Sequence, residues 1–305
     1  MNNPEPGNLL PQGRPVAFEE IEEALQNAAG ETERRLAGTA TLVIAGSAER
    51  LAEAAAALDQ LSDIGVRTVL ISYGENPEPP VRVSLHAVAV EGLCAEYLNN
   101  AVAALRLSSL PTLVWWRGGA TSTLDGLAAL ADRLVLDAQD PTDVWAQVAA
   151  LAEKTAISDL RWTRLTRWRA LMAHCFDLPD VLAAASRMRS LRVEGADRHT
   201  ARLFAGWIAS MLRWPRGQSY EFREKAGGAP IEAVTLGDGS QELWLHLALT
   251  RSCVETSARV HGVDAVSRIV SLGDQGLAAL IGEELRIRAR DIAFERAVAA
   301  SKGMR

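Results

Sequence analysis

The sequence contains little cysteine and no long apolar run, and both shortages narrow the class of protein. The three cysteines, Cys94, Cys175 and Cys253, are an odd number and lie far apart, which argues against a disulfide framework and indicates a reducing compartment. No apolar stretch approaches the roughly 20 residues that a transmembrane helix needs. Residues 1–16 lack the charged start and apolar core of a secretory signal. We therefore expect a cytoplasmic protein without a membrane partner.

Positive charge is also in short supply. The chain carries 32 Lys and Arg residues against 38 Asp and Glu residues, which gives a net charge of −6 at pH 7. Proteins that bind nucleic acid usually present a basic surface that neutralises phosphates. The charge balance therefore gives no reason to expect nucleic acid as a partner.

The motifs of the common enzyme classes are missing as well. The sequence has no G-x-x-x-x-G-K-[ST] or G-x-G-x-x-G phosphate loop and no G-x-S-x-G nucleophile elbow. Its five histidines are scattered, with no pair four residues apart and no Cys-x-x-Cys frame, so a metal site is not expected. These absences predict a protein that is not an enzyme, with no catalytic residue, cofactor or metal.

Residues 17–155 alternate between apolar strand-like runs and helical stretches. The strand-like runs lie at residues 38–45, 67–72, 81–90, 112–116 and 134–137, and the helical stretches at 17–29, 47–61, 94–107, 124–131 and 141–154. Such alternation is typical of a mostly parallel sheet with helices on both faces. It predicts an α/β domain at residues 17–155, behind a flexible leader rich in proline and glycine at residues 1–16.

Residues 156–305 follow another pattern, in which strands cluster together. Strand-like runs lie at residues 188–193, 219–223, 231–236, 242–249 and 254–260, and helices are expected at 160–176, 198–212 and 274–300. The stretch Gly237–Ser240 between two of the runs is a hairpin-turn signal. The pattern predicts an α+β domain with an antiparallel sheet.

Two segments rich in tryptophan and arginine are the candidate binding sites. In the first, strand alternation places Trp115 and Trp116 on opposite faces, and Arg117 leaves the strand at its carboxyl end, where ligands of parallel α/β sheets bind. Packing of both rings in the core is the alternative for the two tryptophans, and we expect it to be the commoner outcome.

The second segment is the expected helix at residues 160–176, which has no acidic residue. Its candidate binding residues are Trp162, Arg164, Arg167, Trp168 and Arg169. The chain as a whole has a net negative charge, but this segment carries a net positive charge. Tryptophan and arginine dominate many interfaces, and arginine binds carboxylates and phosphates bidentately. A site for an anion or an acidic partner and an ordinary solvated helix face are both open at this point.

Cys175 lies on the same helix, next to His174. A cationic environment would lower the pKa of its thiol, whereas burial would make it a small apolar side chain. We expect the second role, and no redox control through an internal disulfide.

At these two segments the sequence resembles the OpcA family, the glucose-6-phosphate dehydrogenase assembly proteins. The family's Pro-x-x-x-Trp-Trp segment is matched by residues 111–116, and its Trp-Thr-Arg-Leu-Thr-x-Trp-Arg motif by residues 162–169. A later Leu-x-x-Gly-Trp helix is matched from Leu203, and the Glu-Glu-Leu-Arg run by residues 283–286. The resemblance implies a non-catalytic assembly factor or allosteric activator that binds glucose-6-phosphate dehydrogenase and raises the NADPH supply from the pentose phosphate pathway.

Two other hypotheses stand beside this one. The chain is alternatively a sensor of a sugar phosphate or nucleotide that acts through its second domain. The third hypothesis is an enzyme whose catalytic residues converge only in the folded chain. Absence of a motif excludes neither, because distant residues can meet in space.

Overall fold

The computed structural model describes residues 9–10, 12–21, 23–24, 39–60, 65–76, 78–84, 87–215, 218–287 and 289–304. The chain forms two compact units. Unit 1 consists of Met1–Leu160 together with Gly276–Arg290, and unit 2 of Arg161–Gln275 together with Asp291–Arg305.

Unit 1 is built on an eight-stranded sheet in the order β1-β4-β5-β3-β2-β6-β7-β8. The strands are β1 (Arg14–Val16), β2 (Ala40–Gly46), β3 (Val66–Gly74), β4 (Val81–Val83), β5 (Ala87–Cys94), β6 (Thr112–Trp116), β7 (Arg133–Leu136) and β8 (Ala156–Asp159). From β5 to β8 all pairings are parallel, and β1 and β4 add antiparallel pairings at one edge. The parallel strands follow the order of the doubly wound dinucleotide-binding fold, with the switch point between β2 and β6.

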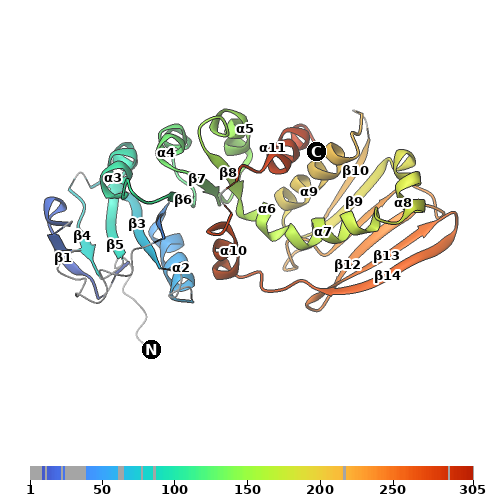
Figure 1. The fold of residues 1–305 in the computed structure, drawn as a ribbon, viewed down its shortest axis with the longest axis horizontal. Coiled ribbons are helices and arrows are strands. Elements are labelled where there is room, and N and C mark those ends of the chain that lie inside the picture. The colour runs from blue at the N-terminus through green and yellow to red at the C-terminus, as the bar shows by residue number, and fades with distance from the viewer. Residues whose placement is uncertain are drawn as a thin grey trace. The chain divides into compact units, whose positions relative to one another are not determined.

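Helices cover both faces of this sheet, as Figure 1 shows, with α2 and α10 on one face and α3, α4 and α5 on the other. They are α2 (Ala48–Leu58), α3 (Leu98–Leu105), α4 (Leu124–Leu130), α5 (Thr142–Leu151) and α10 (Leu277–Glu284), with 3-10 turns η1 (Phe18–Glu20), η4 (Ala95–Tyr97) and η5 (Thr121–Thr123). All of β2 and β6 is buried, which explains their continuous apolar sequence. Ser47 caps α2, since its hydroxyl accepts a hydrogen bond from the Arg50 amide at 3.4 Å. The predicted α/β class is confirmed.

Some boundaries in unit 1 differ from prediction. The expected strand at residues 81–90 is two antiparallel strands, β4 and β5, with Val81 opposite Val90. Apolar residues alternate on both sides of the reversal, and no Gly, Pro or Asn-Gly marks the turn. Residues 14–16, expected in a flexible leader, form β1 against β4. Of the helix expected at residues 17–29, the part from residue 25 onward lies outside the described residues.

Unit 2 contains a six-stranded sheet in the order β10-β9-β11-β12-β13-β14. The strands are β9 (Ser190–Gly195), β10 (Ser219–Glu224), β11 (Ala233–Gly237), β12 (Trp244–Thr250), β13 (Cys253–Val260) and β14 (Val263–Ser271). Only β9 and β10 pair in parallel; the other pairings are antiparallel. The hairpin predicted at Gly237–Ser240 joins β11 to β12. Sequence reasoning missed β14, because a register shift after Ala258 interrupts the apolar alternation that marks a strand.

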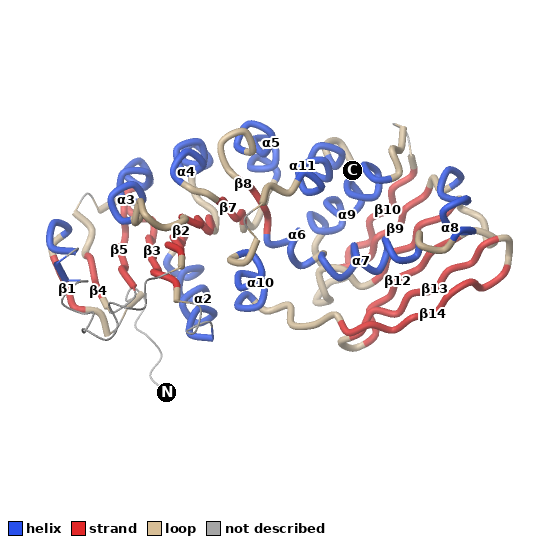
Figure 2. The backbone as a smooth tube through the Cα atoms, viewed as in Figure 1, coloured by secondary structure: helices blue, strands red, loops and turns tan. Residues whose placement is uncertain are grey.

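The helices of unit 2 lie over one face of its sheet, which Figures 1 and 2 both show. They are α6 (Leu160–Arg164), α7 (Thr166–Cys175), α8 (Pro179–Ala184), the 3-10 turn η6 (Ala185–Arg187), α9 (Arg198–Met211) and α11 (Ile292–Ser301). Leu191, Val193, Leu245 and Leu247 are buried on this side. Gly206 lets α9 approach α11 closely, since a Cβ there would collide with the Ala297 carbonyl. The opposite face of the sheet carries none of the described helices.

The expected long helix at residues 274–300 is two helices that belong to different units. Leu280 and Ile281 of α10 join the core of unit 1, whereas α11 packs on α9 in unit 2. Asp291 starts α11, because its carboxylate accepts a hydrogen bond from the Phe294 amide at 2.9 Å. The first segment of unit 1 ends at Leu160, one residue after β8, whereas the expected boundary is residue 155, and residues 276–290 also belong to unit 1. The longest described helix has 14 residues, and none is long and apolar enough to cross a membrane.

Candidate functional site

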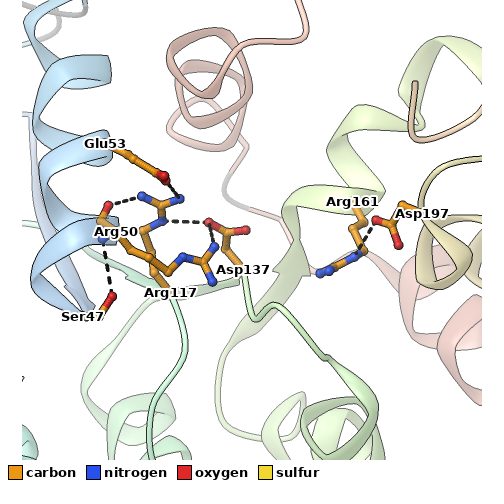
Figure 3. A network of polar contacts seen from close by, with 7 residues as sticks. All are labelled: Ser47, Arg50, Glu53, Arg117, Asp137, Arg161 and Asp197. Carbon is orange, nitrogen blue, oxygen red and sulfur yellow. Dashed lines mark hydrogen bonds and ion pairs between the residues drawn. The ribbon is translucent and has the colours of Figure 1, made fainter. Parts of the chain in front are cut away.

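Arg117 lies at the carboxyl ends of the central strands of unit 1 and is buried. Its Nε atom contacts the Asp137 carboxylate at 2.8 Å, and one Nη atom contacts Glu53 at 3.1 Å. The other Nη atom donates to the Arg50 carbonyl, and the Arg50 side chain reaches the same Asp137 oxygen at 3.0 Å. Figure 3 shows these four residues converging from α2 and from the ends of β6 and β7. We call Arg50, Glu53, Arg117 and Asp137 the strand-end network.

The strand-end network occupies the switch point between β2 and β6, where a doubly wound sheet normally binds its ligand. A dinucleotide site there needs three glycines, for the tight turn, for the approach of the pyrophosphate and for helix packing. The loop into α2 keeps only the first, Gly46, and has Ala48 and Leu51 at the other two positions. Two arginines and two carboxylates lie at this position and pair with one another. The site lacks the cradle that a dinucleotide phosphate requires.

Trp115 and Trp116 lie on opposite faces of β6 and are both buried. Trp115 belongs to the apolar core on the α2 side, and the Arg117 guanidinium stacks on its ring at 4.8 Å. On the other side, burial raises the pKa of the Tyr73 hydroxyl above its usual value.

The Trp/Arg segment of unit 2 is divided between α6 and α7 and is largely internal. The indole of Trp162 donates to Asp291 at 2.7 Å and packs on Phe294 at a ring distance of 5.8 Å. The Arg169 guanidinium lies 3.6 Å from the centre of the Trp162 ring. Asp291 also caps α11. Trp162 thus ties the start of α11 to the α6–α7 segment by packing and by a hydrogen bond.

An ion pair of this segment supports α9. The Nε atom of Arg161 contacts Asp197 at 3.1 Å, as Figure 3 shows. Asp197 caps α9 by accepting hydrogen bonds from the amides of His199 and Thr200. Burial alone would raise the pKa of this carboxyl, but Arg161 and the hydrogen bonds outweigh it and the pKa is lowered. The carboxylate form therefore holds both the helix start and the arginine.

The eight predicted binding residues differ in exposure. Trp115, Trp116, Arg117, Trp162 and Trp168 are buried, Arg164 and Arg169 are half-buried, and Arg167 is exposed. Burial of Trp115 and Trp116 agrees with the core packing that we weighed for them, whereas the solvated helix face weighed for residues 160–176 does not describe the buried Trp162 and Trp168. That any of the eight binds a partner stays a prediction. Arg167 is the one of the eight that is exposed.

Sequence reasoning missed a buried charge cluster in unit 1. Arg133 contacts Glu284 through Nη2 at 2.6 Å and Nε at 2.7 Å, and Ser158 donates to the other Glu284 oxygen at 2.8 Å. Arg133 also donates to the Ala289 carbonyl at 3.2 Å. No periodic signal links residues 151 positions apart. Asp137 was easier to predict than this cluster. It is the last residue of the expected strand 134–137, which is the next strand along the chain after the one that leads into Arg117.

Cys175 is buried on α7, and its thiol donates to the Leu171 carbonyl at 3.4 Å. Burial raises its pKa to about 11. Within the described part of the chain, no three His, Cys, Asp or Glu side chains gather in a way that would hold a metal ion.

The comparisons with a family model and with curated proteins point to the same family. Residues 155–298 match the family described as the C-terminal domain of a glucose-6-phosphate dehydrogenase subunit. A protein named putative OxPP cycle protein OpcA from Synechocystis sp. is 26% identical over 246 residues, which cover 67% of this chain and 52% of that protein. Its namesake from Nostoc punctiforme is 24% identical over 185 residues, or 56% of this chain and 39% of that protein. The chain thus spans about half the length or less of these curated relatives.

Among solved structures, biliverdin reductase in complex with biliverdin and NADP+ from Synechocystis sp. has a TM-score of 0.43 and 11% identity. The alignment covers 86% of this chain and 96% of that chain. A likeness this low carries no argument about function. The match over residues 155–298 and the two curated relatives support instead the OpcA family, whose proteins this chain resembles.

Proposed function

We propose that this protein is a non-catalytic, cytoplasmic partner of glucose-6-phosphate dehydrogenase that promotes the active assembly of that enzyme in the oxidative pentose phosphate pathway. The observation that carries the proposal is the match of residues 155–298 to a domain of a dehydrogenase subunit. The names of the two curated relatives point to the same pathway.

The strand-end network of unit 1 supports the non-catalytic part of the proposal. A dehydrogenase must place the pyrophosphate of its cofactor against a helix N-terminus. Here Arg117, Glu53 and Asp137 meet beside the start of α2, and Leu51 is buried where the third glycine would stand. Separating these side chains to admit a cofactor would leave the buried Arg117 charge without its partners, which costs several kcal/mol.

Arg167 is the residue through which the contact is best tested, because it is exposed on α7 and the segment around it carries no acid. If α7 meets an acidic surface of the dehydrogenase, Arg167→Glu should weaken binding by about tenfold or more through like-charge repulsion. Arg251→Glu is the matched control, since Arg251 is an exposed arginine in the β12–β13 turn.

The experiment measures the mass of mixtures of the chain and the dehydrogenase by light scattering after size exclusion. We expect the wild-type chain and Arg251→Glu to co-migrate with the enzyme and Arg167→Glu to co-migrate much less. If Arg167→Glu binds as tightly as the control, α7 is not the contact. If the wild-type chain does not co-migrate at all, the proposed function is wrong.

A further inference from the structure

The helix-free face of the unit 2 sheet carries a hollow of about 330 Å³. It lies over β9, β11 and β12 and is bordered by the turn that joins β11 to β12. Ligand pockets span about 300–1,000 Å³, so this hollow has room for one small molecule and not for a dinucleotide.

Cross-strand register explains why a hollow forms there. Gly237 lies between Ser190 on β9 and Trp244 on β12. A residue without a side chain and a short serine leave space beside the large indole, which forms one wall. Gly237 is fixed by packing, because an added Cβ would press on the Leu243 carbonyl. The Arg259 guanidinium, itself paired with Asp264 at 2.7 Å, lies 5.4 Å from the indole centre and holds the ring in place.

The next row across the same face supplies the polar groups. Thr235 has Arg192 on one side and His246 on the other. The Thr235 hydroxyl is 2.9 Å from Nδ1 of His246, which leaves Nε2 as the imidazole nitrogen that can meet a ligand. Arg192 uses Nε to bind Glu221 at 2.6 Å, so its two Nη groups can serve a second anion. An arginine fork, an imidazole and a hydroxyl in one row suit a phosphate group.

The carboxylates near the hollow already have hydrogen-bond or ion-pair partners within the chain. No Asp or Glu is among its lining residues. At the rim, Asp238 accepts a hydrogen bond from the Ser240 amide at 2.9 Å. Glu221 is shared between Arg192 and Arg223 at 2.6 and 2.7 Å. An incoming anion therefore faces the Arg192 guanidinium, the Thr235 hydroxyl and the His246 imidazole, with no carboxylate among the lining residues.

We propose that this hollow binds a sugar phosphate. The phosphate lies over Thr235 between Arg192 and His246, and the carbon skeleton packs on the apolar face of Trp244. Ser190 and Gln241, which also line the hollow, offer hydrogen bonds to the sugar hydroxyls. This combination of one aromatic wall with a few convergent polar groups is typical of small-molecule sites. The inference concerns unit 2 alone and does not depend on binding to the dehydrogenase.

Calorimetric titration of the full chain tests the site, with glucose 6-phosphate, glucose and inorganic phosphate as separate probes and no dehydrogenase present. We expect saturable binding of glucose 6-phosphate that is tighter than that of either fragment. Arg192→Gln and His246→Gln should each weaken it by about tenfold or more, the usual cost of a charge-assisted hydrogen bond. Ser190→Phe should abolish it by filling the hollow from β9.

Arg223→Gln is the matched control, because Arg223 is an exposed arginine that binds the same Glu221 but does not line the hollow. It should leave affinity unchanged, and the thermal midpoint of every variant shows whether it folds. Three results would overturn the proposal: no saturable binding of glucose 6-phosphate, equal binding of inorganic phosphate, or equal weakening by Arg223→Gln and Arg192→Gln.

Discussion

At the scale of single residues, the buried arginines of this chain have internal partners. Arg117 reaches two carboxylates and a carbonyl, and Arg133 reaches both Glu284 and a carbonyl. A guanidinium presents several donors in a fixed plane, so it can join segments that are far apart in sequence. Sequence reasoning took Arg117 for a binding residue and missed Arg133. The sequence does not show whether an arginine forms its ion pairs inside the fold or with a partner.

Replacing Arg117 should therefore destabilise unit 1. We expect Arg117→Ala to lower the free energy of unfolding by about 3 kcal/mol, at the low end of the loss for a buried ion-pair partner, since Asp137 keeps Arg50. Arg117→Lys should recover only part of this, because an ammonium lacks the planar fork. Urea denaturation measures both. Wild-type stability of Arg117→Ala, together with lost binding to the dehydrogenase, would make Arg117 an interface residue instead.

The thiol of Cys175 should be unreactive in the native chain. Its pKa is raised to about 11 by burial, so almost no thiolate exists at pH 8, and access is blocked as well. We expect iodoacetamide at pH 8 to modify the half-buried Cys94 and Cys253 well before Cys175. Mass spectrometry of timed samples locates the label.

The raised pKa also fixes the sign of a pH effect. Because the unfolded thiol, at its ordinary value of 9.0, loses its proton before the folded one, Cys175 contributes stability that is complete below pH 9 and lost as the pH rises towards 11. Cys175→Ser should flatten that part of the stability profile. Labelling of Cys175 as fast as Cys94 would contradict the buried assignment.

At the scale of elements, sequence reasoning located those strands and helices that are bounded by proline, glycine or a helix-capping residue. The strand at residues 112–116 follows Pro111 and ends before two glycines, and Ser47 announces α2. The misses have several causes: no turn residue marks the reversal between β4 and β5, and a register shift interrupts the alternation before β14. The break between α10 and α11 follows from Glu284 docking on Arg133 in one unit and Asp291 capping a helix in the other, and only the Asp291 cap is a local sequence signal.

The docking of α10 can be tested through Glu284. Glu284→Ala leaves the buried Arg133 without its carboxylate, and we expect a loss of about 3–5 kcal/mol in the stability of unit 1. Glu284→Gln should cost less, because the amide can still accept hydrogen bonds. Native-state hydrogen exchange should show the amides of α10 exposed in Glu284→Ala and those of α11 protected as in the wild type. Equal loss of protection in both helices would mean that they form one cooperative element.

At the scale of the whole molecule, the fold and the proposed function rest on different parts of the chain. The strand order gives unit 1 the layout of a dinucleotide-binding domain, but the residues at its switch point pair with each other. The family match covers residues 155–298, most of which belong to unit 2, and the Trp/Arg motif of unit 2 is largely core. The motif therefore identified the family through residues that hold the fold together. The open sheet face, with Arg192 and His246, had no motif to reveal it, because register brings those residues together.

The central claim is that the chain acts on glucose-6-phosphate dehydrogenase without catalysing the reaction itself. The most direct test follows NADPH formation from glucose 6-phosphate and NADP+ at a fixed concentration of the dehydrogenase while the chain is titrated in, beside a series that contains the chain alone. We predict a saturable increase in rate with the enzyme present and no NADPH from the chain alone. A rate that does not respond to the chain, or NADPH formed by the purified chain without the dehydrogenase, would contradict the account.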